Sequence, residues 1–265
     1  MSPTRSARMP AVFLGHGSPM NAIAHNAYGQ AWHALGRSLA KPQAILAVSA
    51  HWYTHGTAVT AMEAPRTIHD FGGFPQALFD VQYPAPGSPA LAERVRELLA
   101  PVEVHMDRSW GLDHGTWGVL VHAFPDADIP VVQLSIDGDQ PAAFHYELGQ
   151  RLAPLRDEGV LIVGSGDVVH NLRTARRSDS AAPYDWAVQF NDFVRDHVQR
   201  GDHAPLIDYE NLGQAARMSV PTPEHYLPLL YVLGAQQDNE KASVVTDGID
   251  LGSISMLSVS VGAQA

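Results

Sequence analysis

Four short apolar runs divide the chain, and each ends abruptly in small or polar residues. The runs cover residues 11–14, 44–49, 131–136 and 160–163, and are followed by Gly15-His16-Gly17, His51, Asp137 and Gly164-Ser165-Gly166. Short β-branched runs with such ends are typical of buried parallel strands. Residues 58–62 and the alternating residues 253–261 predict a further, antiparallel or edge contribution to the same sheet.

Segments between these runs carry helix signals. The predicted helices cover 27–39 after Asn26, 90–99 after Ser88 and Pro89, 141–152 capped by Asp139, 184–199 before Gly201, and a segment opened by Thr222-Pro223-Glu224 that runs to about residue 233. Strands alternating with helices indicate an α/β fold. We expect a flexible N-terminus over 1–9 and a single domain over 10–265, with a central mixed, mostly parallel sheet flanked by helices.

The stretch 64–89 has no helical period and is rich in proline, glycine and aromatic residues. It predicts a long ordered loop, and such loops in compact domains usually serve function. Its aromatic residues around Asp70-Phe71-Gly72-Gly73-Phe74 would wall a site and exclude water.

Composition narrows the chemistry. The 265 residues are 45% hydrophobic and 17% charged, an ordinary globular balance, and include no cysteine. Any metal must therefore be held by imidazole and carboxylate. The 28 acidic residues outnumber the 17 Lys and Arg, for a formal charge of -11, which disfavours nucleic acid as a partner.

The hydrophobic pattern contains neither a signal peptide nor a membrane span. Only the four apolar residues 11–14 follow the N-terminal MSPTRSARMP, too few for a signal-peptide core. No apolar run approaches the roughly 18 residues of a membrane span. We expect a cytoplasmic protein with no membrane partner.

Fourteen histidines are the unusual feature of the composition. His16, His51 and His170 each follow a predicted strand, and His225 lies in the first turn of the helix opened by Pro223. A lone histidine after a strand is usually a hydrogen-bonded turn residue. Because the carboxyl ends of parallel strands meet in one crevice, three such placements predict a convergent imidazole metal site there.

The remaining candidates are less specific. The pair Asp113-His114 precedes a predicted helix. Asp113 could cap that helix beside a structural histidine, or the pair could act as a general acid/base. The glycine motifs fit neither a serine-hydrolase elbow, a dinucleotide fingerprint nor a P-loop. The histidines interpreted as surface or helix-face residues are His25, His33, His55, His105, His122, His145, His197 and His203.

Six motifs taken in order resemble one family. They are Gly15-His16-Gly17-Ser18-Pro19, Ser49-Ala50-His51-Trp52, residues 69–75 (HDFGGFP), residues 112–117 (LDHGTW), residues 164–172 (GSGDVVHNL) and His225-Tyr226-Leu227-Pro228-Leu229. Any one motif is weak, but the ordered set resembles the DOPA 4,5-dioxygenase branch of the class III (LigB-like) extradiol ring-cleavage dioxygenases.

The resemblance implies a non-haem metal centre that opens a catechol with O₂. His16, His51 and His225 match the metal ligands, His170 a fourth ligand or the acid/base, and His114 a second-sphere histidine that handles substrate and protons. Better-known members of the superfamily have a glutamate as third ligand, whereas this chain reads Glu224-His225. A dioxygenase requires Fe²⁺, although three imidazoles also suit Zn²⁺. A small aromatic diol and O₂ are the implied partners, and a homo-oligomer is possible.

Two other classes of function stay open at this point. A zinc-dependent hydrolase of a small amide or ester, with His170 or Glu224 as general base, accounts equally well for the histidines. A non-catalytic binding protein is the second alternative, disfavoured because His114 and all four other histidines are present. Uptake of O₂ with a catechol separates the dioxygenase from both.

Overall fold

The structure is a computed structural model that describes residues 8–176 and 181–262. Its strands are β1 (Ala11–Gly15), β2 (Ala44–Thr54), β3 (Thr57–Thr60), β4 (Val104–Asp107), β5 (Val131–Asp137), β6 (Val160–Gly166), β7 (Ala242–Thr246), β8 (Ile249–Asp250), β9 (Ile254–Ser255) and β10 (Ser258–Val261). Its α-helices are α1 (Ala27–Ser38), α2 (Gln76–Phe79), α3 (Pro89–Leu99), α4 (His114–Ala123), α5 (Ala142–Leu152), α6 (Pro154–Asp157), α7 (Asp185–Arg200), α8 (Ala204–Ile207), α9 (Gln214–Ser219) and α10 (Leu227–Gly234), with 3₁₀ turns at Pro19–Ala22 and Tyr209–Asn211.

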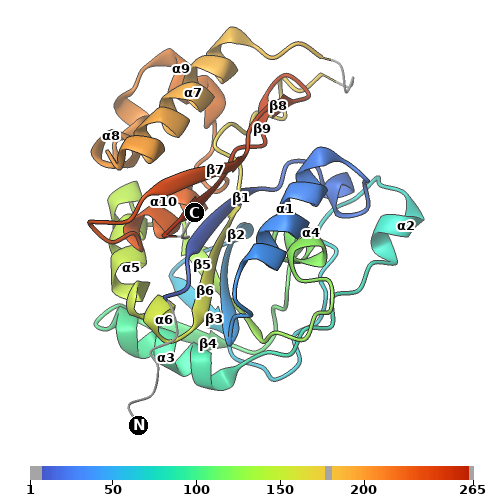
Figure 1. The fold of residues 1–265 in the computed structure, drawn as a ribbon, viewed down its shortest axis with the longest axis vertical. Coiled ribbons are helices and arrows are strands. Elements are labelled where there is room, and N and C mark those ends of the chain that lie inside the picture. Colours follow the sequence, from blue (N-terminus) through green and yellow to red (C-terminus); the bar gives the residue numbers. More distant parts are fainter. Residues whose placement is uncertain (1–7, 177–180, 263–265) are drawn as a thin grey trace.

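One mixed sheet organises the molecule, in the order β4-β3-β5-β2-β6-β1-β10-β7 (Figure 1). Its centre is parallel: β2 pairs with β5 and β6, and β6 pairs with β1. β10 joins antiparallel to β1 and β7. The predicted α/β fold with a mixed, mostly parallel sheet is confirmed.

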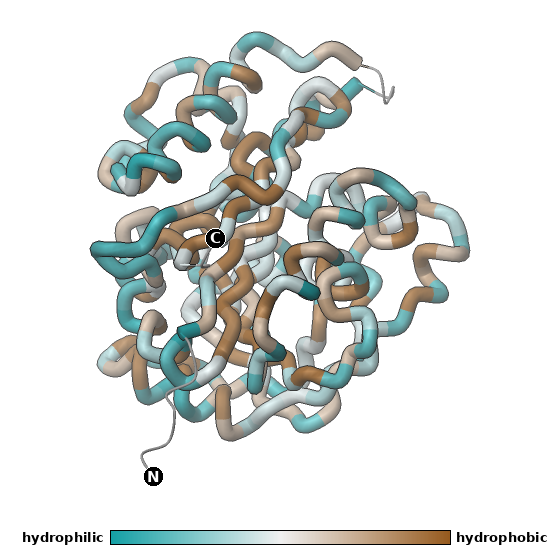
Figure 2. The backbone as a smooth tube through the Cα atoms, in the orientation of Figure 1, coloured by the Kyte–Doolittle hydropathy of each residue, from teal (hydrophilic) through white to brown (hydrophobic). Residues whose placement is uncertain are grey.

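Helices cover both faces of the sheet because the central strands are apolar on both sides. Alternate residues of β1 point to opposite faces, so Phe13 packs in the cluster with α3, α5, α7 and α10, while Val12 and Leu14 pack with α1 and α4. The central strands form the most hydrophobic part of the backbone trace, and the polar residues lie mainly on the outer helices and loops (Figure 2). No helix within the described ranges is long and apolar enough to cross a bilayer.

Several local predictions were wrong. Asp139 does not cap α5, which begins after Pro141 without a side-chain cap; its carboxylate instead lies 3.0 Å from His55 Nδ1. The antiparallel contribution expected of residues 253–261 is confirmed for β10, which pairs antiparallel with β1 and β7 inside the main sheet, but β9 pairs instead with β8 in a separate small sheet. The loop 64–89 contains the short helix α2.

The predicted N-terminal tail lies largely outside the described residues. Of its last two residues, Arg8 forms an ion pair with Asp157, and Met9 is buried and donates its N–H to the Arg156 carbonyl. Arg156 is itself fully buried and connects the segment before β1 with the segment between α10 and β7. Its guanidinium donates to the carbonyls of Met9 and Ala235 and to both carboxylate oxygens of Glu240.

Replacing Arg156 by Met should therefore destabilise the fold strongly. The change leaves Glu240 and two carbonyl groups without their donor, a loss of about 3 to 5 kcal/mol for a broken buried pair. Urea denaturation measures the free energy of unfolding. The control Arg94→Met, which removes exposed contacts to Glu158 and Glu97, should leave the midpoint nearly unchanged. Equal effects of the two substitutions would contradict this role for Arg156.

Candidate metal centre

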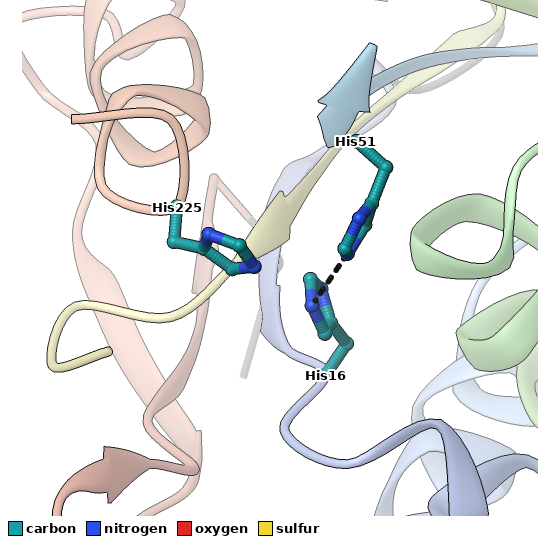
Figure 3. Close-up of side chains that lie close together, drawn as sticks. All are labelled: His16, His51 and His225. Carbon is teal, nitrogen blue, oxygen red and sulfur yellow. Dashed lines mark hydrogen bonds between the residues drawn. The ribbon is translucent and has the colours of Figure 1, made fainter. Parts of the chain in front are cut away.

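Three histidine side chains from separate elements point toward one another (Figure 3). His16 follows β1 directly, and His225 lies in the turn just before α10, not in its first turn as expected. Each offers a ring nitrogen, as does His51, and the three atoms lie within 4.8 Å of one another.

His51 is not at the end of its strand, because β2 continues to Thr54. Its pairing with β6 stops at Ser49, and its register with β5 shifts between Val48 and Tyr53. This irregularity lies where His51 faces the centre, as bulges beside functional sites often do.

Glycines keep these side chains close to the backbone. A Cβ on Gly115 in α4 would lie 2.8 Å from His51 Cδ2, and one on Gly166 would lie 2.1 Å from the His225 carbonyl oxygen. Both positions therefore require glycine for space.

Hydrogen bonds determine which ring nitrogen of each histidine keeps a free lone pair. Ser165 Oγ donates its hydrogen to the Gly115 carbonyl, so it accepts from His16 Nδ1 at 3.0 Å. Nε2 of His16 then keeps a lone pair. It lies 3.2 Å from His51 Nε2, while His51 Nδ1 faces the Asp70 carboxylate at 3.4 Å. Both Nε2 atoms are thus directed at the same point, and their outer nitrogens are held by polar partners.

Asp70 from the long loop links two of the histidines. Its Oδ1 accepts the backbone N–H of His114, and its Oδ2 lies 3.0 Å from His114 Nδ1 as a close but poorly aligned contact. Phe71 meets the His114 ring edge-on, with centroids 5.4 Å apart. The predicted aromatic wall is therefore in place beside the centre.

His170 reaches the centre by stacking. Its ring lies parallel to that of His225, with centroids 3.5 Å apart and an interplanar angle of 7°. It is partly exposed, whereas His16 and His225 are buried. All five histidines singled out from the sequence thus lie together.

Four histidines of the cluster have lowered pKa values, so their imidazoles stay neutral well below the usual pH of protonation. Burial, with the neighbouring imidazoles, lowers the pKa of His16 and His225 well below the ordinary value. The same causes lower the pKa of His51 to about 3 and that of His170 to about 4. Burial would raise the pKa of Asp70, but its hydrogen bond and charge interaction with His114 outweigh that effect and lower it.

The donor set fits a divalent metal. Neutral imidazoles are its usual nitrogen ligands, and two nitrogens bound tetrahedrally at about 2.0 to 2.1 Å lie roughly 3.3 Å apart. His16 Nε2 and His51 Nε2, at 3.2 Å, match this spacing.

Asp113 caps α4, one of the two roles expected for it, by accepting the Thr116 N–H. Sequence reasoning missed the other polar groups that orient the histidines, namely Ser165, Asp70 and Ser49. Ser49 Oγ donates to Asp113 Oδ1 at 2.6 Å and accepts the His51 N–H. Each lay inside a quoted motif, which was the available signal. The interpretation of His145 as a surface or helix-face residue was incomplete: it lies on α5 but is fully buried, against the Tyr231 hydroxyl.

Known proteins are similar to this chain over nearly its whole length. A family model described as the catalytic LigB subunit of aromatic ring-opening dioxygenase matches residues 10–262. The 4,5-DOPA dioxygenase extradiol of Escherichia coli K12 is 58% identical over 261 residues, covering 97% of this chain and 96% of that protein. The protein of the same name from Beta vulgaris is 41% identical, covering 92% of each chain. A crystal structure of an uncharacterized E. coli K12 protein, JW3007, superposes with a TM-score of 0.85 at 51% identity, covering 96% of this chain and 100% of that chain.

The histidine centre on this sheet, in a chain matched along nearly its whole length, defines a metal-dependent extradiol ring-cleaving dioxygenase of class III. The chain belongs to the LigB family of aromatic ring-opening dioxygenases. The zinc-hydrolase alternative is not favoured.

The metal-free protein should lose stability as the pH falls. The folded-state pKa values of His51 and His170, about 3 and about 4, lie below the ordinary 6.5. Between these values the unfolded chain binds more protons, so their stabilising contribution is complete above about pH 6.5 and is lost as the pH falls toward 4. His170→Gln removes one such group and should flatten the slope of unfolding free energy against pH by up to about 1.4 kcal/mol per unit. Urea titrations from about pH 7 to 4.5 measure this slope for both proteins. Identical slopes for wild type and His170→Gln would contradict the lowered pKa of His170.

Proposed function

We propose that this enzyme opens the ring of a DOPA-like catechol at an Fe²⁺ centre held by His16, His51 and His225, with His170 and His114 moving protons. The observation that carries the ligand assignment is the convergence of three ring nitrogens, two of them 3.2 Å apart with their outer nitrogens hydrogen-bonded or facing a carboxylate. The names of the E. coli and Beta vulgaris relatives support the substrate class.

Iron is proposed over zinc because of the reaction. When bound, Fe²⁺ supplies the electron exchange between catechol and O₂, and zinc, which has a single stable valence, cannot. Zn²⁺ fits the same nitrogens and would occupy the site without turnover.

His170 is the proposed proton acceptor. It stacks on His225 yet is partly exposed, so a catechol entering beside it would meet a neutral imidazole. The pKa of about 4 keeps the ring unprotonated at neutral pH, ready to take a hydroxyl proton.

His114 and its surroundings hold the substrate side of the centre. Asp70 faces Nδ1 of His114, which leaves Nε2 to exchange a proton with the substrate. Phe71, edge-on to this ring, and Phe74, edge-on to Phe71, supply an apolar surface that excludes water from the reacting ring.

The metal requirement has a direct test. Protein freed of metal by a chelator and reloaded with Fe²⁺ should consume O₂ in proportion to a catechol such as DOPA and form a yellow semialdehyde, whereas Zn²⁺-loaded protein should bind the catechol without O₂ uptake. An oxygen electrode and absorbance measure both. Failure of Fe²⁺-loaded protein to consume O₂ across a panel of catechols would contradict the proposed substrate class.

Substituting His170 should have a different effect from substituting the metal ligands His16 or His51. His170→Gln is expected to retain the metal and bind catechol but lose roughly 10²- to 10⁴-fold in kcat, as for removal of a general acid/base. His16→Ala or His51→Ala should instead empty the site. Metal analysis and steady-state kinetics distinguish the two. Loss of metal from His170→Gln as complete as from His16→Ala would make His170 a fourth ligand and pass the proton role to His114.

A further inference from the structure

A small cavity lies beside the histidine centre, between the 3₁₀ turn Pro19–Ala22 and helix α4. Two of the histidines, His16 and His114, form its buried inner wall. The outer lining consists of Ser18, Pro19, Asn21, Ala22 and Gly118, and all of these except Asn21 are partly exposed. The cavity therefore extends from near the surface of the molecule to the metal centre.

The size of this cavity excludes an aromatic substrate. The centre of a water-sized sphere can move through only about 10 Å³ of it. That is close to the smallest space that holds one water molecule, so a catechol ring does not fit. The catechol needs another entrance, and His170, the partly exposed histidine beside which we place it, does not line this cavity.

The lining favours an apolar gas over water, because nearly all of its surface is apolar. The polar side chains of the outer lining are already hydrogen bonded. Ser18 Oγ accepts the Met20 N–H, and Asn21 donates to the His16 carbonyl and accepts from Asn26. A bound water needs about two to four polar partners, and apolar cavities without them stay dry and take up apolar atoms. Molecular oxygen, the co-substrate of a dioxygenase, is an apolar molecule of suitable size.

Gly118, in the middle of α4, contributes the open space. A glycine inside a helix makes the fold less stable than an alanine would. A Cβ on Gly118 would meet one atom outside its own helix backbone, the Cβ of Ala22, at 3.8 Å. That is an ordinary contact distance, so steric crowding does not require glycine at this position.

The other glycines within the helices of residues 8–176 and 181–262 are explained by lack of space. A Cβ would lie between 1.9 and 2.9 Å from a neighbouring atom at Gly29, Gly36, Gly115, Gly149 and Gly234. At Gly118 the missing methyl group instead leaves room between two residues that line the cavity.

We propose that this cavity admits O₂ to the metal centre and that Gly118 keeps it open. The inference rests on the proposed function, in which O₂ and a catechol react beside His16. A separate entrance on the side of His16 and His114 lets O₂ arrive while the catechol covers the side of His170.

Gly118→Ala tests the proposal, because it adds one methyl group between the walls of the cavity. We expect kcat/KM for O₂ to fall by about 10-fold or more, the usual effect of one carbon in an apolar pocket. The metal content, the dissociation constant of the catechol without O₂ and kcat at saturating O₂ should be unchanged. The melting temperature should be the same or higher, because alanine stabilises the helix. An oxygen electrode at varied O₂ concentration measures the kinetics.

Two further variants control for a general effect on α4. Val121→Ile adds one carbon to the same helix, at a partly exposed residue that does not line the cavity, and should leave kcat/KM for O₂ unchanged. Combining Gly118→Ala with Ala22→Gly removes the methyl group of the opposite wall and should recover part of the loss.

Occupancy of the cavity can be measured without turnover. Crystals of Zn²⁺-loaded protein under pressurised krypton, an apolar atom near O₂ in size, should show krypton between Ala22 and Gly118 in wild type and none there in Gly118→Ala.

The outcomes distinguish this inference from the proposed function. Unchanged kcat/KM for O₂ in Gly118→Ala, an equal loss of catechol affinity, or absence of krypton from the wild-type cavity would overturn the O₂ route, while turnover by wild type would still support the proposed function. If wild type consumes no O₂ with any catechol, both are wrong. If Gly118→Ala does not fold, Ala22→Val narrows the cavity from the opposite wall and should lower kcat/KM for O₂ in the same way.

Discussion

The centre depends on keeping several buried imidazoles uncharged while their rings lie in contact. Protonating any of them would place a cation beside other imidazoles in a largely desolvated site, and the lowered pKa values of His16, His51, His170 and His225 express that penalty. Neutral rings with free lone pairs are metal ligands and proton acceptors at ordinary pH. The sheet makes this arrangement possible, because adjacent parallel strands deliver His16 and the residues after β6 to the same edge.

Much of the fold was predictable because its central strands are buried on both faces. Continuous apolar runs marked β1, β2, β5 and β6, and Asn26 and Ser88 both cap the helices expected after them. The edge strands β4 and β7 gave no such signal, since both are largely half-exposed and their side chains need not be apolar. Asp139 satisfied the local rule for a cap, yet it faces His55 instead.

The histidines were predictable and most of their supports were not. Placement after strands singled out His16, His51 and His170, and the resemblance added roles for His114 and His225. Asp70 and Ser165 contact histidines 44 and 149 residues away in the chain, so local patterns could not reveal their partners. The irregularity that presents His51 from within β2 is likewise a property of pairing between strands.

The claim that this centre performs ring opening with O₂ is tested most directly by isotope labelling. Fe²⁺-loaded enzyme given a catechol under isotopically heavy O₂ should yield a ring-opened product that carries oxygen from the gas, and none should form without O₂. A product whose added oxygen comes from water alone, or one formed equally well anaerobically by zinc-loaded protein, would contradict the account and point to hydrolysis.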